Sequence, residues 1–393
     1  MIYVDHNATS PLTPAVKKAM SEALEMTLAN PNSPHRMGQE SRASVEESRE
    51  TIAKALGCDI GEIIFTASAS EANFLALMGL WFARRKENSS RSTIYVSPME
   101  HSSVYENLNF MAECLDAKIE KIPLTSKGSL DLAAFKKTLE KSKSDVALVT
   151  AMGAHNETGI VQPWEKLAEI CGKFQIPFHT DLLQCLGRRP FSLKAPGLST
   201  ASFGFHKIGG PKGVGVLVVR TGVAFTPVLR GGAQEKKRRA GTENILGIVG
   251  AAAAVREIET LRKSYENHVQ PLRNKLEKLI LDMCPNAKVV GKDEGLDRLP
   301  NTSFVVLSNA RSDAVLMHLD VNGVCASSGS ACASGMVLPS KALLALGYPE
   351  SDATCAVRFS LAPSNTEAEI QNVAKLIREG VSRICPERAI VGK

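Results

Sequence analysis

Short apolar runs alternate along this chain with longer segments in which apolar residues recur at helical spacing. The short runs predict β-strands at 62–66, 93–97, 146–150, 176–180, 201–205 and 214–219. The segments between them predict helices near 41–56, 70–87, 103–114, 131–141 and 163–174. Because strands and helices alternate in this order, we predict an α/β fold with a mostly parallel sheet between helices.

The rhythm of the pattern changes after Thr242. A long helical pattern continues to about Met283, with a break expected near Gln270 and Pro271. Strand-like segments at 303–307, 324–326 and 356–361 follow, together with helices near 339–346 and 366–382. The change indicates a second, smaller domain.

The composition of the 393 residues, 44% hydrophobic and 22% charged, is that of a soluble globular protein of two to three domains. The net charge of +6 is too small to indicate nucleic-acid binding. The densest basic run, 236–239, is typical of a solvated loop or of a loop beside an anionic cofactor. Neither a signal peptide nor a membrane span of roughly 20 apolar residues is expected.

The nine cysteines are odd in number and scattered, which favours reduced thiols and a cytoplasmic location. The sequence contains neither a Cys-x-x-Cys pair nor a His-x-x-x-His pair, so no metal site is expected.

Lys207 follows an apolar run and precedes the glycine-rich turn Ile208–Gly213. A lysine at such a strand end lies beside flexible backbone that a small ligand can approach. If it is desolvated, its pKa falls and its neutral amine can form a Schiff base. A lysine before a turn is more often a solvated surface residue, so other residues must decide between these interpretations.

Asp181 ends another predicted strand, in the segment Pro177–Gln184. Parallel sheets place ligand-binding side chains at the carboxyl ends of their strands, so Asp181 and Lys207 are expected to converge on one ligand. Pyridoxal phosphate requires such a pair, because a lysine forms the Schiff base and an aspartate keeps the pyridinium nitrogen protonated. The alternative for Asp181 is a helix N-cap.

Several further motifs occur in one order along the chain. They are Tyr3–Thr9, Glu100–His101, Asn156–Gly159, His179–Asp181 with Gln184, His206–Lys207, Arg238–Asn244, Ser327–Cys332 and Val357–Leu361. Together they resemble the cysteine desulfurases of the NifS/IscS type, over nearly the whole chain. The Ser-Ser-Gly-Ser-Ala-Cys motif resembles the subgroup of these enzymes that has a long catalytic loop.

The resemblance implies a fold-type-I pyridoxal-phosphate-dependent transferase that acts as a homodimer. Its large domain, 14–258, is expected to bind the cofactor. The smaller α+β domain is expected to comprise 1–13 and 259–393 and to carry a catalytic cysteine loop at about 325–338.

The segment from Ser68 to Glu71 has the spacing of a capping box at the start of a helix, which suits the phosphate of a cofactor. By resemblance, Ala69 and Ser70 bind this phosphate together with His206 and with Thr242 supplied by the partner subunit. The alternative for the segment is a plain helix cap.

By resemblance, His101 stacks on the cofactor ring and acts as an acid or base, for which a planar group that titrates near neutral pH is suited. The alternative is a helix-capping histidine. Asn156 and Gln184 are expected to bind the phenolic oxygen of the cofactor. His155 stands where the family often has asparagine, and no role is predicted for it.

Cys332 lies among small and polar residues, which favours an exposed thiol that attacks a substrate as a thiolate. The other eight cysteines are interpreted as small buried apolar residues. Arg358 interrupts an apolar strand and is expected to bind the carboxylate of the substrate, with Asn7 assisting. The alternative for Arg358 is a structural ion pair.

The resemblance therefore implies that the enzyme takes sulfur from L-cysteine, releases L-alanine and leaves a persulfide on Cys332. Acceptors for iron–sulfur cluster assembly, cofactor synthesis or tRNA thiolation would then take the sulfur. Two alternatives stay open: another pyridoxal-phosphate reaction such as selenocysteine lysis, and a non-catalytic scaffold that docks sulfur-transfer partners.

Overall fold

The computed structural model describes residues 1–26, 29–292, 295–328 and 338–385. Its strands are β1 (Ile2–Tyr3), β2 (Ile63–Thr66), β3 (Thr93–Val96), β4 (Lys118–Lys121), β5 (Val146–Thr150), β6 (Phe178–Asp181), β7 (Leu198–Gly204), β8 (Gly215–Val219), β9 (Ala287–Val289), β10 (Thr302–Leu307), β11 (Val324–Cys325) and β12 (Ala356–Ser360). Its α-helices are α1 (Pro14–Glu25), α2 (Arg36–Leu56), α3 (Ala69–Glu87), α4 (Ser102–Leu115), α5 (Leu132–Ser142), α6 (Trp164–Lys173), α7 (Ile245–Val255), α8 (Ile258–Ser264), α9 (Gln270–Met283), α10 (Ser312–Val321), α11 (Lys341–Ala345), α12 (Glu350–Ala353) and α13 (Glu367–Ile384).

The larger sheet has seven strands in the order β2-β8-β7-β6-β5-β3-β4. Strand β8 runs antiparallel to both of its neighbours, while the other pairs are parallel. The prediction of a mostly parallel sheet between helices is therefore confirmed.

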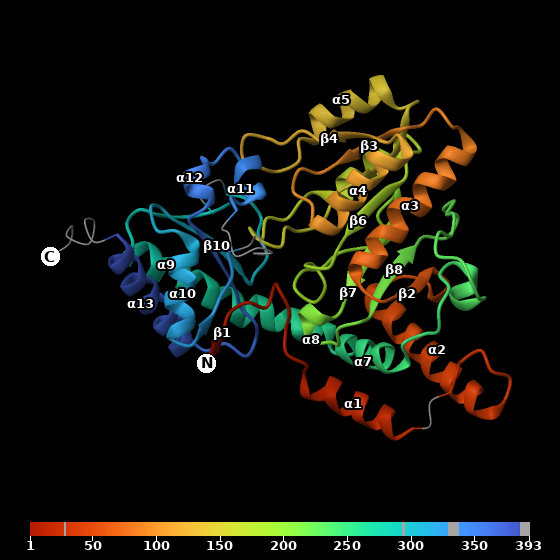
Figure 1. Cartoon of the computed structure of the whole chain (residues 1–393), viewed down its shortest axis with the longest axis horizontal. Helices are drawn as coiled ribbons and strands as arrows, with labels where there is room; N and C mark the ends of the chain where they lie inside the picture. Colours follow the sequence, from red (N-terminus) through yellow and green to blue (C-terminus); the bar gives the residue numbers. More distant parts are fainter. Residues whose placement is uncertain (27–28, 293–294, 329–337, 386–393) are drawn as a thin grey trace.

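Helices lie on both faces of this sheet (Figure 1), and alternate side chains of its strands enter two separate apolar layers. In β2, Ile63 and Phe65 pack on the face covered by α2, α5, α6 and α7, whereas Ile64 faces α3. The alternation follows from the two-residue period of a strand. Because both faces are covered, ligands can approach this sheet only along its edges and strand ends.

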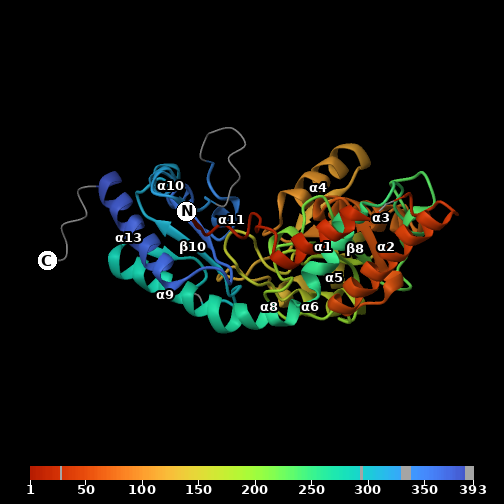
Figure 2. The same cartoon turned by 90° about the horizontal axis from the view of Figure 1, so that it is seen from below.

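A smaller unit lies beside the carboxyl ends of the parallel strands (Figures 1 and 2). It contains the antiparallel sheet β12-β10-β9 and the parallel pair of β1 with β11. Helices α9, α10 and α13 cover one face of the antiparallel sheet, and the short helices α11 and α12 lie on the other. The chain therefore begins in this smaller unit, crosses to the larger one and returns.

A nearly continuous run of helices, α7 to α9, joins the two units along one side of the molecule (Figure 2). The predicted break near Gln270 and Pro271 is absent, because the chain widens into a π-helical turn at Tyr265–Val269 and continues as α9. Such a turn makes room for proline, which lacks an N–H and crowds the carbonyl four residues earlier. Among the described residues, no helix is long and apolar enough to cross a membrane.

Some elements were not predicted from the sequence. Strand β4 has the sequence Lys-Ile-Glu-Lys and lies at the edge of the sheet, where it needs no apolar face. Helices α1 and α10 were also missed, and β7 begins at Leu198 rather than at Ala201. The boundaries of the other predicted strands and helices differ from the structure by a few residues.

Gly215 allows the start of α3 to pack directly on β8, because an added Cβ would lie 2.5 Å from the carbonyl carbon of Ser68. We expect Gly215→Ala to lower the free energy of unfolding by about 1–3 kcal/mol, as overpacked sites do. Thermal or denaturant unfolding would measure this. The matched control is Gly61→Ala, whose Cβ would come no closer than 3.9 Å to a flexible lysine end. Equal stability of the two variants would contradict the assignment.

Candidate active site

Lys207 lies in a single 3-10 turn, His206–Ile208, directly after β7. The turn closes at Gly209, whose φ of 81° is in the left-handed region that favours glycine. Only 6% of Lys207 is exposed, and its ammonium group has no hydrogen bond or ion pair within the described part of the chain. Burial lowers the pKa of Lys207 to about 7, an effect that the nearby Asp181 opposes. The lysine can thus be a neutral amine near neutral pH.

Asp181 ends β6 and is the register partner of Ser202 in β7. The predicted convergence of Asp181 and Lys207 at neighbouring strand ends is therefore what the structure shows. The carboxylate of Asp181 accepts hydrogen bonds from the side chain of Asn73 and from the backbone N–H of Leu183, each 2.9 Å long. The second bond closes a local turn, so Asp181 caps this turn and not a helix, which was the alternative considered from the sequence.

Asn73, on α3, was not recognised in the sequence although it connects three polar groups of the site. Its amide nitrogen donates to Asp181 and to the hydroxyl of Ser103, and its amide oxygen lies 3.1 Å from Nε2 of His179. The asparagine is fully buried, so its partners fix its orientation. The only signal in the sequence was a polar residue directly before the apolar run Phe74–Trp81.

His101 caps the N-terminus of α4, as the alternative interpretation predicted. Its Nδ1 accepts a hydrogen bond from the backbone N–H of Ser103 and lies 2.8 Å from the Ser103 hydroxyl. Nδ1 is therefore an acceptor and Nε2 carries the proton. Burial lowers the pKa of His101, and the charges of Asp181 and Lys207 also act on it, which places the ring near both groups. The capping bonds hold the ring in one orientation beside them.

Glu100 is a second acidic group that the sequence did not reveal as part of the site. Burial, assisted by the charge of Asp181, raises the pKa of Glu100 to about 8. One carboxyl oxygen accepts a bond from the backbone N–H of Met152, and the other has no partner among the described residues. Glu100 is therefore mainly protonated near neutral pH, which leaves Asp181 as the negative charge of the pair.

The start of α3 forms the expected anion-binding end of the site. Ser68 caps the helix by accepting from the backbone N–H of Glu71, but Glu71 bonds to the N–H of Ala67 and so completes only part of the predicted capping box. Ser70 is exposed in the first turn, where free N–H groups carry partial positive charge. An ideal Cβ on Gly204 would lie between Ala69 and His206, which places these residues side by side.

His206 is half-buried beside the N-terminal segment, with Nδ1 3.2 Å from the hydroxyl of Thr9. Burial and the neighbouring cations Lys207 and Lys212 lower its pKa to about 4, so it is neutral near neutral pH. Thr242 is exposed and lines a cavity with Ala67 and Arg239. This position is close to the start of α3 in the same chain.

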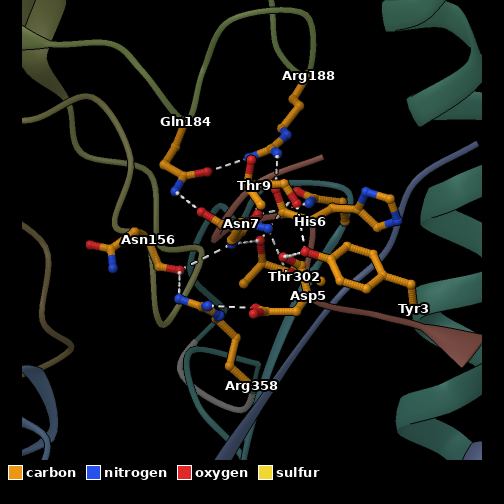
Figure 3. A network of polar contacts seen from close by, with 12 residues as sticks. Tyr3, Asp5, His6, Asn7, Thr9, Asn156, Gln184, Arg188, Thr302 and Arg358 are labelled. Atoms are coloured by element: carbon orange, nitrogen blue, oxygen red, sulfur yellow. Dashed lines mark hydrogen bonds and ion pairs between the residues drawn. The ribbon is translucent and has the colours of Figure 1, made fainter. Parts of the chain in front are cut away.

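Asn7 is the centre of a buried network between the two units (Figure 3). Its amide nitrogen donates to the backbone carbonyl of Asn156 and to the hydroxyl of Thr302, and its amide oxygen accepts from Arg188 and Asn301. The side chain therefore uses its donors and acceptors within the protein. This arrangement favours a role in positioning Asn156 over direct contact with a substrate.

Arg358 approaches the same network from β12 (Figure 3). It forms a 2.6 Å ion pair with Asp5 and donates to the backbone carbonyl of Asn156, while its Nε has no partner in the described part of the chain. The structural ion pair considered from the sequence is thus present. A guanidinium has five N–H donors, so these bonds leave donors for a further anion.

Cys332 lies outside the described residues, but the chain on both sides of its segment is anchored at the site. Ser327 forms an antiparallel bridge with Arg358, and Ser340 donates a 2.6 Å hydrogen bond to the carboxylate of Glu157. The described residues that flank this segment therefore lie beside Arg358 and Glu157.

Four of the other cysteines, Cys171, Cys185, Cys284 and Cys355, are buried as predicted. The prediction is wrong for Cys114, which is exposed because α4 buries Val104, Leu108 and Met111 on its opposite face. Cys58, Cys325 and Cys385 are half-buried. No group of three or more histidine, cysteine or acidic side chains among the described residues could hold a metal ion.

His155, for which no role was predicted, organises the turn that carries Asn156. Its Nδ1 lies within hydrogen-bonding distance of the backbone N–H groups of Glu157 and Thr158, at 3.3 and 3.2 Å. An asparagine side chain could make the same bonds, which explains how histidine substitutes for it. Burial lowers the pKa of His155 to about 3, so the ring is a neutral acceptor.

A buried amine destabilises a protein without ligand, because the unfolded state binds a proton that the folded state binds weakly. The pKa of Lys207 falls from 10.5 to about 7 on folding, so stability is lost as pH falls from about 10.5 to 7. We expect Lys207→Met to stabilise the ligand-free protein near pH 7 by on the order of 3 kcal/mol, and less near pH 10. Thermal unfolding at both pH values would measure this.

The matched control for that measurement is Lys212→Met, which removes an exposed amine three residues beyond the turn. It should leave stability nearly unchanged at both pH values. If Lys207→Met destabilised the protein at pH 7, the amine of Lys207 would be charged and paired, contrary to the structure.

The family model described as aminotransferase class-V matches residues 2–373. The chain is 35% identical, over 98% of its length, to the IscS-like cysteine desulfurase of Mycobacterium tuberculosis, of which it covers 97%. It is equally 35% identical, over 98% of its length, to the cysteine desulfurase NifS of Azotobacter vinelandii, of which it covers 93%.

Solved structures agree with this relationship. A NifS-like protein superposes with a TM-score of 0.88 at 33% identity, covering 97% of this chain and 99% of the other. SspA in complex with cysteine superposes with a TM-score of 0.79 at 28% identity, covering 93% of this chain and 100% of the other. The family resemblance predicted from the sequence motifs is confirmed.

Proposed function

Because the chain belongs to the class-V aminotransferase family, we propose that it is a pyridoxal-phosphate-dependent cysteine desulfurase. It takes sulfur from L-cysteine and releases L-alanine. The observation that carries this proposal is the placement of Lys207 and Asp181, both buried, at neighbouring strand ends. Such a pair is the requirement of this cofactor.

The residues present fit pyridoxal phosphate. Lys207 is a buried amine with a pKa near 7, suited to a covalent bond with an aldehyde. Asp181 would hold the proton on the ring nitrogen, and the first turn of α3 with Ser70 and His206 would hold the phosphate. When bound, the cofactor supplies an electron sink for the carbanion that forms at Cα of an amino acid.

The protein's own groups then have distinct tasks. Arg358 binds the carboxylate of L-cysteine through its guanidinium, and its ion pair with Asp5 fixes the guanidinium in place. The Nζ of Lys207 accepts the proton from Cα, because a lysine with a pKa near 7 is half neutral there. His101 faces Asp181 and Lys207 as a second acid or base.

Cys332 completes the reaction as the sulfur acceptor. Its thiolate attacks the sulfur of the substrate, so the carbon–sulfur bond breaks, a sulfur–sulfur bond forms, and the products are L-alanine and a persulfide on Cys332. In support of this role, Ser327 and Ser340, on the two sides of its segment, contact Arg358 and Glu157. A second protein or a small thiol then takes the outer sulfur. Because relatives of this chain are named IscS and NifS, we propose that the sulfur is used in iron–sulfur cluster assembly. We place the activity in the cytoplasm, where free thiols persist.

The first test is the release of L-alanine from L-cysteine by the cofactor-loaded protein in the presence of a reductant. We expect Cys332→Ala to reduce turnover at least about a thousandfold, because the nucleophile is lost. The cofactor should still bind Lys207, as its absorbance would show.

Cys114→Ala is the matched control, because it removes another thiol that is exposed on the surface. This variant should keep the turnover of the unmodified enzyme. Full turnover in Cys332→Ala would exclude the persulfide mechanism, and loss in both variants would exclude a special role of Cys332.

We further propose that the active unit is a homodimer in which Thr242 completes the phosphate site of the partner subunit. Thr242 and its neighbour Gly241 are exposed, so the loop is available to a second copy. The adjacent Arg239 forms an ion pair with Glu71 in the first turn of α3 of its own chain, which anchors the loop and leaves Thr242 exposed.

Complementation between inactive subunits tests this arrangement. Mixed dimers of Lys207→Ala and Thr242→Ala subunits contain one site with both residues intact only if Thr242 acts on the partner. We expect such mixtures to regain alanine release well above either parent and to retain cofactor in about half of the sites of each dimer. No recovery after verified subunit exchange would mean that Thr242 acts within its own chain or has no role.

A further inference from the structure

Arg188 is a buried cation in the turn between β6 and β7, with only 1% of its surface exposed. Its Nη1 donates to the amide oxygens of Asn7 and Gln184, and its Nη2 donates to the backbone carbonyls of His6 and Lys207. One side chain thus joins the N-terminal segment to the turn after β6 (Figure 3). It also contacts the backbone of the lysine.

All four partners of this guanidinium are neutral oxygens. No carboxylate among the described residues pairs with Arg188, and its Nε is buried without a partner. The guanidinium lies 5.8 Å from the ring centre of Tyr265, which stabilises a cation only modestly. A buried charge without a counter-ion is costly, so its presence indicates an anion that arrives with a ligand.

The hydrogen bond from Arg188 also determines which end of the Gln184 amide is available. A guanidinium has donors only, so the amide atom that faces it must be the oxygen. The amide nitrogen of Gln184 is left to donate one hydrogen to the backbone carbonyl of Asn7, 3.3 Å away, and keeps a second hydrogen. Without Arg188, the amide could rotate and present its oxygen instead.

We propose that Arg188 is a positioning residue that holds Gln184 with its amide N–H, not its carbonyl oxygen, directed to the phenolic oxygen of pyridoxal phosphate. The inference rests on the proposed cofactor. In this proposal Arg188 does not touch the cofactor, but it fixes the orientation of Gln184, which does. Gln184 and Arg188 are both buried, so neither can be replaced by water in this role.

The charge of Arg188 and the hydrogen bond that it fixes both weaken proton binding at Lys207. The pKa of Lys207 is lowered chiefly by burial, and Arg188 contributes to this lowering. Arg188 likewise adds to the effect of burial in lowering the pKa of His6 to about 4. Both an N–H donated to the phenolic oxygen and a nearby cation disfavour a proton on the nitrogen that joins Lys207 to the cofactor.

The test is a pH titration of the absorbance of the bound cofactor, which reports the protonation of that nitrogen. We expect Arg188→Met to raise the midpoint by about one pH unit or more, equivalent to a tenfold change in the proton equilibrium. Arg188→Lys keeps the charge but offers one compact ammonium in place of the fork, so it should also raise the midpoint. Full restoration by lysine would overturn a role in orientation.

A double variant tests whether Arg188 acts through Gln184. Gln184→Ala alone should raise the midpoint, and Arg188→Lys, which keeps the charge, should add no more than about 0.3 pH unit to it, because coupled residues are not additive. Additive shifts would overturn the proposal. Cofactor dissociation, measured by dialysis, should be faster in Gln184→Ala and in Arg188→Met than in the unmodified protein.

Arg273→Met is the matched control for the loss of a buried guanidinium, because Arg273 is 5% exposed on α9 in the smaller unit. It is expected to lower the unfolding temperature and leave the midpoint unchanged. An equal midpoint shift in this control, or none in a folded Arg188→Met protein, would overturn the proposal. A protein that binds the cofactor but releases no alanine would refute the proposed reaction alone, since the titration does not require turnover.

Discussion

Four hydrogen bonds of the Asn7 side chain hold the N-terminal segment between the two sheets of the molecule. Two of them lead to the larger sheet, through Asn156 and Arg188, and two lead to Asn301 and Thr302 at the start of β10 in the smaller sheet. Because the amide is buried, each of these bonds must be made or its desolvation is uncompensated. The relative placement of Arg358 and Gln184, on opposite sides of the segment, depends on this amide.

Desolvation determines the chemistry of the site as much as individual contacts do. The same burial lowers the pKa of Lys207 to about 7 and the pKa of His101 below its ordinary value, and it raises the pKa of Glu100 to about 8. Backbone groups fix two side chains of the site, since Leu183 bonds Asp181 and Ser103 bonds His101. A pre-organised polar site of this kind needs little rearrangement when a ligand binds.

The sequence allowed the sheet and the strand-end residues to be predicted because their signals are local. Strand β5 was predicted with its observed bounds, and Lys207 and Asp181 were recognised from their positions after apolar runs. Asn73 and Arg188 were missed because their importance comes from partners distant in the chain, such as Asp181 for one and Asn7 for the other. Burial of a polar residue within a turn leaves no periodic pattern in a sequence, so such residues are found only when the fold is known.

Because of the buried amine of Lys207, the stability of this protein depends on the supply of its cofactor. A ligand that binds only the folded state stabilises it by mass action, so the protein with cofactor unfolds less often than the protein without it. Cellular proteases remove proteins in proportion to how often they unfold. We therefore expect the steady-state amount of the enzyme, and not only its activity, to follow the vitamin B6 status of the cell.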